Sequence, residues 1–145
     1  MTKLSEHFTL AEFLVSETAS RHGIDNTPDE RVIENLKLTA LVMEEVRELV
    51  GRPVIITSGY RGPALNRAVG GSVNSAHMQG LAADFIVPPL TPLEICRMIA
   101  ASDIVYDQLI YEHTWVHLGL TLKESPRHQK LTLLSSGSYA QGFVA

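Results

Sequence analysis

The order of hydrophobic and polar positions predicts helices in the first third of the chain. In residues 26–51, apolar side chains return every three to four positions, the spacing of one buried helix face. Asn26 or Thr27 is expected to cap this helix, with Pro28 at its first helical position. A shorter helix is expected over residues 10–22. The chain should therefore begin with helices.

Short apolar runs predict strands in the remainder of the chain. The β-branched run at residues 54–57 and the apolar run at 81–87 indicate two buried strands. Residues 107–112 and 115–120 are two extended runs with only two residues between them, which predicts a hairpin. A further strand is expected at the sheet edge over residues 131–134.

The connecting segments carry turn and capping residues. Residues 58–63 have the composition of a turn, and residues 68–80 are rich in glycine and serine, which favours a loop. Residues 91–94 (Thr-Pro-Leu-Glu) form a capping box that predicts a helix to about residue 102. The segment after Ser135 is rich in serine and glycine, so we expect a loosely held tail.

The composition fits one domain and excludes several classes of protein. We expect a single α+β domain over residues 1–145, with N-terminal helices packed on a small, largely antiparallel sheet and a core at about 8–134. With 45% hydrophobic and 19% charged residues, the chain is not a disordered tail. A net charge of −4 argues against nucleic-acid binding through a broad basic surface. No apolar run approaches the about 20 residues of a membrane helix, so no membrane insertion is expected.

Two polar residues inside apolar strands and one loop histidine are candidate metal ligands. Asp84 lies within the apolar run 81–87, where a carboxylate is costly unless it is paired or bound to metal. His117 also interrupts an apolar strand, and His77 lies in the glycine- and serine-rich loop. For each residue alone, a satisfied structural polar group remains the alternative. Together, two neutral imidazoles and one carboxylate form a set that suits zinc and leaves a fourth position for water.

A glutamate and an arginine are candidate catalytic groups. A two-residue turn after Glu112 would place Ile110 opposite His117 and Glu112 on the same face of the hairpin. Glu112 and His117 would then be diagonal neighbours, about 7–8 Å apart between backbones. Arg61 follows a strand end, and its guanidinium suits a carboxylate or a developing oxyanion. A solvated hairpin glutamate and a solvated loop arginine are the alternatives.

Three segments resemble the M15 zinc peptidases. Residues 75–84 (Ser-Ala-His-Met-Gln-Gly-Leu-Ala-Ala-Asp) resemble the family signature S-x-H-x-x-G-x-A-x-D. Residues 58–63 (Ser-Gly-Tyr-Arg-Gly-Pro), followed by Asn66, are similar to its S-G-Y-R-S-P…N segment, and residues 115–117 match its late W-x-H strand. The resemblance covers roughly residues 8–120 in the right order. The family includes D-Ala-D-Ala carboxypeptidases, the D,D-dipeptidases of vancomycin resistance and the L-alanyl-D-glutamate endopeptidases of phage endolysins.

The resemblance implies a fold, a cofactor and a set of site residues. The implied fold is the Hedgehog/D,D-peptidase-like α+β type. The implied cofactor is Zn²⁺, held by three ligands: His77, Asp84 and His117. A late acidic residue would be the base, and Arg61 would stabilise the transition state. Three further residues would bind substrate: Tyr60, Ser75 and Gln79.

One departure from the family pattern concerns the base. The better-known members carry the acid three residues before the last histidine, where this chain has Thr114. Glu112 is the nearest carboxylate, and His113 is its competitor for the role. A second departure is Gly62, which replaces the second serine of the arginine segment.

The resemblance implies a zinc-dependent peptidase that hydrolyses the peptide part of bacterial peptidoglycan, as a D,D-carboxypeptidase or an L-Ala-D-Glu endopeptidase. Its partner would be the stem peptide, and we expect a monomer. Glu6 and His7 stand where a signal peptide would place its apolar stretch. We therefore expect synthesis in the cytoplasm and action on the cell wall after phage-type release. The alternative is a catalytically silent, zinc-stabilised module that binds cell-wall peptide or interacts with a partner.

Overall fold

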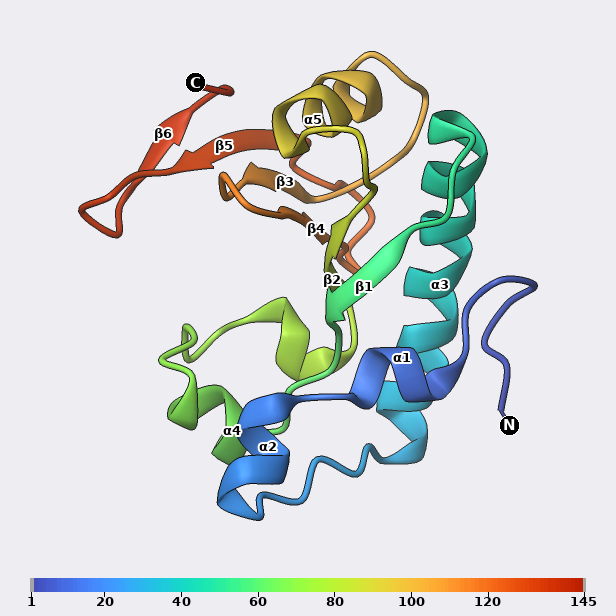
Figure 1. Cartoon of the computed structure of the whole chain (residues 1–145), viewed down its shortest axis with the longest axis vertical. Coiled ribbons are helices and arrows are strands. Elements are labelled where there is room, and N and C mark those ends of the chain that lie inside the picture. Colours follow the sequence, from blue (N-terminus) through green and yellow to red (C-terminus); the bar gives the residue numbers. More distant parts are fainter. Residues whose placement is uncertain (1, 145) are drawn as a thin grey trace.

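The computed structural model describes residues 2–144 and joins six helical segments to one six-stranded sheet (Figure 1). The helical segments are α1 (Leu10–Leu14), α2 (Glu17–His22), α3 (Glu30–Val50), α4 (Pro63–Ala68), the 3₁₀ segment η1 (Ala76–Gln79) and α5 (Pro92–Ala100). The strands are β1 (Ile55–Ser58), β2 (Ala82–Ile86), β3 (Gln108–Tyr111), β4 (Val116–Gly119), β5 (Gln129–Leu133) and β6 (Tyr139–Gln141). The predicted α+β class is confirmed.

The sheet has the strand order β1-β2-β4-β3-β5-β6. Its neighbouring strands are antiparallel except for the parallel pair β3 and β5, so the predicted largely antiparallel sheet is confirmed. The predicted register of the hairpin is also confirmed, because Ile110 lies opposite His117. Asp84 lies opposite His117 on the other side of β4. These three side chains therefore project from the same face of the sheet.

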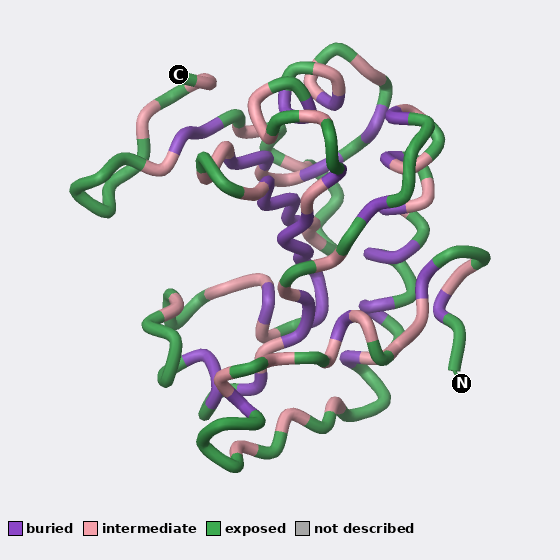
Figure 2. The backbone as a smooth tube through the Cα atoms, in the orientation of Figure 1, coloured by how far each residue is buried: buried purple, intermediate pink, exposed green. Residues whose placement is uncertain are grey.

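The other face of the sheet carries the hydrophobic core. Alternate residues of the central strands contribute to it: Ala83, Phe85, Leu109, Val116 and Leu118. The helices α3 and α5 supply the matching apolar side chains, and α5 packs against α3, β3 and β4. Buried positions accordingly concentrate in the central strands and along one side of α3 (Figure 2). None of the helices that the structure describes is long and apolar enough to cross a membrane.

The long helix α3 begins later than the sequence pattern predicts. Its N-cap is Asp29, whose carboxylate accepts a hydrogen bond from the backbone N–H of Val32 at 2.9 Å. Asn26 is engaged elsewhere: its amide donates to the carbonyls of Leu14 and Tyr60 and accepts from a third backbone group. The predicted capping by Asn26 or Thr27, with Pro28 inside the helix, is therefore wrong.

The predicted helix over residues 10–22 is two short helices. Thr9 caps α1, and Ser16 caps α2 by accepting a hydrogen bond from the backbone of Ala19. The chain leaves the helical conformation at Val15, where φ is −64° and ψ is 130°. Ser16 is thus a second capping residue inside the segment, and it starts a new helix. The carbonyl of Leu14 accepts a hydrogen bond from the side chain of Asn26.

Two helical segments lie where we predicted only turn and loop. Pro63 is at the first turn of α4, and Ser75 caps η1. Both segments are too short, at 6 and 4 residues, for a hydrophobic period to appear. Their Pro and Ser residues were the available signals, because Pro favours the first helical position and Ser the N-cap.

The C-terminal segment is held by the sheet rather than loosely attached. The predicted edge strand is β5, but β6 pairs with it and forms the edge instead. The hydroxyl of Thr132 on β5 donates to the carbonyl of Gly142 and accepts from the N–H of Val144, each at 2.8 Å. The two strands extend from the body of the molecule as a hairpin (Figure 1). The prediction of a loose tail after Ser135 is therefore wrong for residues 139–141.

Candidate metal centre

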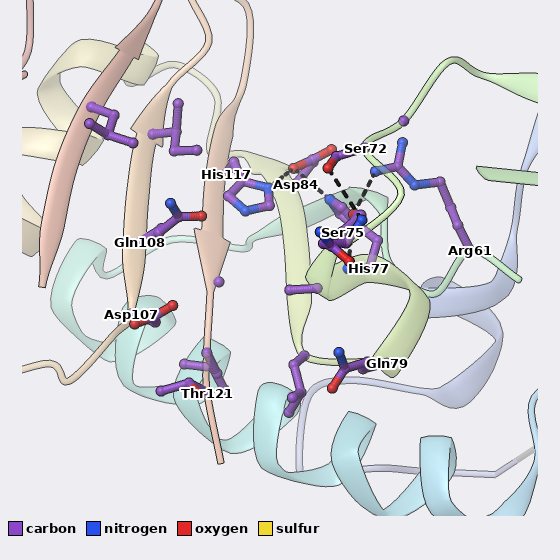
Figure 3. A pocket seen from close by; sticks show the side chains of 18 of the residues that line it. Arg61, Ser72, Ser75, His77, Gln79, Asp84, Asp107, Gln108, His117 and Thr121 are labelled. Carbon is purple, nitrogen blue, oxygen red and sulfur yellow. Dashed lines mark hydrogen bonds and ion pairs between the residues drawn. The ribbon is translucent and has the colours of Figure 1, made fainter. Parts of the chain in front are cut away.

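Three side chains from different parts of the chain converge in a buried cluster: His77 of η1, Asp84 of β2 and His117 of β4 (Figure 3). Asp84 Oδ1 lies 2.9 Å from His117 Nδ1 and 3.3 Å from His77 Nε2. One ligand atom of each residue lies within 4.8 Å of the other two. The structure thus brings together the three residues that the sequence proposed as metal ligands. We name this group the His-Asp-His cluster.

The backbone around η1 fixes the orientation of the His77 ring. His77 Nδ1 lies 2.6 Å from the carbonyl oxygen of Gly59. Because a carbonyl can only accept, Nδ1 carries the proton and the lone pair on Nε2 faces Asp84. The turn that follows η1 requires glycine, since Gly80 has φ +74° and a Cβ there would lie 2.8 Å from the backbone oxygen of Val32. The close contact between η1 and α3 therefore sets the position of His77.

The ring of His117 turns the opposite nitrogen, Nδ1, toward the cluster. A small residue two positions later leaves space for the ring. A Cβ on Gly119 would lie 3.2 Å from His117 Nε2, closer than ordinary van der Waals contact. A larger residue at position 119 would therefore require the imidazole to shift by a few tenths of an ångström.

Burial and neighbouring charges shift the pKa values of two of the three residues, Asp84 and His77. Burial opposes ionisation of Asp84, but His77 and His117 more than offset it, so the pKa of Asp84 lies below its ordinary value. Burial lowers the pKa of His77, and Asp84 only partly offsets this. An ionised carboxylate and a neutral imidazole are the forms that act as metal ligands. The donor set therefore fits a divalent transition metal.

Glu112 lies at the edge of the cluster, as the predicted hairpin register requires. Its Oε2 is 4.0 Å from His117 Nδ1, and its side chain is 14% exposed. Burial raises the pKa of Glu112 above its ordinary value, and the carboxylate of Asp84 adds to the rise. A carboxylate with a raised pKa beside a possible metal site is suited to accept and release a proton.

His113, the competitor of Glu112, and the nearby carboxylate of Asp107 are both engaged elsewhere. The ring of His113 bonds through Nε2 to the carbonyl of Leu133 at 2.8 Å and packs at an interplanar angle of 50° against Tyr111, with ring centroids 4.6 Å apart. The carboxylate of Asp107 forms an ion pair with Arg127 at 2.7 Å. Neither side chain is therefore free to act as a proton acceptor at the cluster in this arrangement.

Arg61 brings a positive charge to the same site (Figure 3). Its guanidinium Nη2 lies 3.4 Å from the hydroxyl of Ser75, and its backbone N–H donates to the carbonyl of His77. Its buried Nε has no hydrogen-bond partner among residues 2–144. Burial lowers the pKa of Arg61, which Asp84 and Glu112 partly offset. Because the only side-chain hydrogen bond of Arg61 among residues 2–144 goes to Ser75, its remaining terminal N–H groups are the donors available to a bound ligand.

The remaining predicted site residues divide into two groups. Ser75 and Gln79 line the cleft, as expected, and Ser75 also accepts a bond from the N–H of His77. Tyr60 does not line the cleft; it is 9% exposed and belongs to the hydrophobic core. The predicted substrate contact of Tyr60 is not supported.

The cleft contains residues that the sequence did not single out. Its volume is about 1300 Å³, and it extends from Arg61 across the cluster to Leu131, Leu133 and Tyr139 of β5 and β6. Tyr139 comes directly after a serine- and glycine-rich segment, so no hydrophobic pattern in the sequence predicts a strand there. Its place in the cleft follows from strand pairing between distant segments.

A buried His-Asp-His cluster in a cleft, with a carboxylate and a guanidinium beside it, is an arrangement typical of metal-dependent hydrolases. The family model described as Peptidase M15 matches residues 6–119, which include the cluster, Arg61 and Glu112. The chain belongs to the peptidase M15 family, and the family implies a metallopeptidase. In the comparison with curated proteins, nothing matches this chain.

Proposed function

We propose that this protein is a zinc-dependent peptidase that hydrolyses the peptide part of bacterial peptidoglycan. The observation that carries the proposal is the buried His-Asp-His cluster, with Glu112 Oε2 4.0 Å from His117 Nδ1, inside a chain of the M15 family. Substrate class and metal identity come from the family resemblance, and the donor set and cleft support them.

The cluster has the composition of a catalytic zinc site. His77 would bind through Nε2, His117 through Nδ1, and Asp84 through its carboxylate. Within residues 2–144 the cluster comprises only these three ligands, whereas structural zinc sites usually have four protein ligands. Zinc bound there would polarise the carbonyl of the scissile peptide bond and lower the pKa of a water molecule.

Glu112 is the proposed general base. It accepts a proton from the water that attacks the carbonyl carbon, and it then gives a proton to the nitrogen of the leaving amine. The C–N bond breaks, and a carboxylate and an amine are released. The raised pKa of Glu112 supports both halves of this role, since the group must bind the proton and then lose it.

Arg61 is the proposed stabiliser of the transition state. As the carbonyl carbon becomes tetrahedral, its oxygen gains negative charge, and a fixed cation lowers the energy of that state. Ser75 contacts the guanidinium from one side at 3.4 Å, which is the only side-chain hydrogen bond of Arg61 among the described residues. The planar guanidinium can therefore orient toward an oxyanion without losing its anchor.

The test is the identification of products from purified peptidoglycan. The zinc-loaded protein should release stem-peptide fragments, and mass spectrometry identifies the broken bond. A new D-alanine product indicates D,D-carboxypeptidase activity, and a free L-alanine carboxyl group indicates an L-Ala-D-Glu endopeptidase. The competing function is a silent module that binds cell-wall peptide; such a module would bind zinc and release nothing.

Action on the cell wall after phage-type release stays a prediction. It rests on the resemblance to the peptidases of phage endolysins. Purified protein should lower the turbidity of Gram-negative cells whose outer membrane has been permeabilised, and a Glu112→Gln preparation should not. Equal turbidity loss with both preparations would contradict lysis by hydrolysis.

A further inference from the structure

The β5–β6 hairpin forms one wall of the cleft, although it lies outside the part of the chain that matches the family. The family match ends at residue 119, and the hairpin comprises residues 129–141. Leu131, Leu133 and Tyr139 of this hairpin line the same cleft as the His-Asp-His cluster. Beyond β3, the sheet continues into these two strands, which the match does not include (Figure 1).

The strand register directs these side chains to the face that carries the cluster. Ile110 on β3 lies opposite His117 on one side and opposite Leu131 on the other. Residues paired across a sheet project from the same face, so Leu131 projects with His117. Leu133, two residues further along β5, projects in the same direction.

Tyr139 completes a row of side chains that begins at Glu112. Leu133 is paired with Tyr139 on β6, and continuing the β3–β5 register by two residues sets Glu112 beside Leu133. Two strand spacings separate the backbones of Glu112 and Tyr139 by about 10 Å, which a tyrosine side chain partly bridges. Burial raises the pKa of Tyr139, and Glu112 and Asp84 add to the rise. The residue is 54% exposed, so its side chain remains accessible to a ligand.

The two walls of the cleft differ in chemistry. Arg61 and Ser75 lie on one side of the cluster, beyond Asp84 as seen from His117, and they offer N–H and O–H groups (Figure 3). The β5–β6 hairpin lies beyond β3 on the opposite side, and it offers two leucines and the face of an aromatic ring. A peptide that lies across the cluster can direct its reacting carbonyl to the polar wall and a flanking apolar group to the hairpin.

We propose that Tyr139, together with Leu133, forms a substrate subsite for a small, uncharged aliphatic group next to the scissile bond, such as an alanine methyl. This inference rests on the proposed function, because the stem peptide supplies alanine beside either candidate bond. Tyr139 selects and positions the substrate and takes no part in bond breaking. The hairpin then sets the substrate preference of this chain.

The experiment compares Tyr139→Ala with Gln141→Ala in the zinc-loaded full-length protein. Gln141 is an exposed residue of the same strand and face, but it does not appear among the described residues that line the cleft. Trp115, the single tryptophan of the chain, lines the cleft, so its fluorescence should report binding. The probe is a synthetic stem pentapeptide that contains both candidate bonds. Binding is measured in a Glu112→Gln background, in which turnover is too slow to deplete the peptide during the titration, and kcat and KM are measured with Glu112 in place.

Tyr139→Ala should raise Kd and KM about 10-fold or more, the range for losing an apolar contact in a specificity pocket, and should leave kcat and zinc content nearly unchanged. Tyr139→Phe should restore KM, because the ring supplies the contact, and Gln141→Ala should match the parent.

Unchanged Kd and KM in Tyr139→Ala, with an active parent, would overturn the subsite alone. An equal loss in Gln141→Ala would also overturn it, since hairpin folding would then explain the effect. A parent that neither binds nor cleaves the peptide would refute the proposed function itself, and the subsite with it.

Discussion

The two faces of one sheet carry opposite chemistry in neighbouring residues. On β2, Phe85 is fully buried in the core beneath α3 and α5, while Asp84 projects from the other face into the cluster. On β4, Val116 and Leu118 flank His117 in the same way. The strand alternation thus lets a single apolar segment hold two functions. The apolar side chains of the core face stabilise the fold. The buried polar groups of the cluster face cost free energy of folding, and we expect their role to be chemical.

The largest expected effect is the loss of a ligand on the cluster face. Asp84→Ala should lose zinc and reduce hydrolysis below detection, because two imidazoles alone do not complete the three-ligand set. Metal content by mass spectrometry and peptide release measure the two losses. The matched control is Asp107→Asn, another cleft-lining aspartate that pairs with Arg127. Retention of zinc and activity in Asp84→Ala would remove Asp84 from the proposed site.

The next effect concerns the proton acceptor. Glu112→Gln keeps the shape of the side chain and should keep zinc, but hydrolysis should fall by about 10²–10⁴, the usual range for a positioned acid–base group. His113→Ala is the control, since its ring bonds to Leu133 rather than facing the cluster. Single-turnover rates measure both variants. Loss of activity in His113→Ala with an active Glu112→Gln would reverse the two roles.

A substitution on the core face should lower the free energy of unfolding and leave zinc binding by the folded protein unchanged. Phe85→Ala removes a fully buried ring and should cost about 3–5 kcal/mol of the free energy of unfolding. Denaturant unfolding of the zinc-loaded protein measures this loss. The fraction that remains folded should still bind one zinc per chain. A variant that is as stable as the parent but lacks zinc would show that the two faces are not separable.

A smaller effect is expected at the polar wall. Arg61→Lys keeps the charge but loses the planar donor pattern, so kcat should fall by about 10²–10³ with the melting temperature and zinc content unchanged. The control is Arg67→Lys on α4, whose arginine does not appear among the described residues that line the cleft. Near-normal kcat in Arg61→Lys would contradict transition-state stabilisation by Arg61 and favour the alternative of a solvated loop arginine.

The sequence predicted the cluster face better than the surrounding chain, for a physical reason. Asp84 and His117 interrupt apolar strands, and such residues are rare unless something compensates for their burial. The position of Glu112 followed from the two-residue turn, and the register Ile110–His117 confirms that turn. These inferences depend on strand alternation and short-range geometry, which a sequence shows directly.

The errors arose where distant contacts decide local structure. Asn26 could not cap α3 because its side chain already bonds to Leu14, Tyr60 and the backbone of Gly62. The parallel pairing of β3 with β5, which brings the β5–β6 hairpin to the cleft, depends on a contact between segments about 20 residues apart in sequence. No local period marks such pairing, so the position of Tyr139 in the cleft could not be predicted.

The most direct test of the central claim combines zinc removal with product identification. The parent protein should contain one zinc per chain and release a defined stem-peptide fragment from purified peptidoglycan. Treatment with a chelator should remove both the metal and the activity, and added zinc should restore the same fragment. Full release of that fragment by a preparation shown to contain no metal would contradict the account.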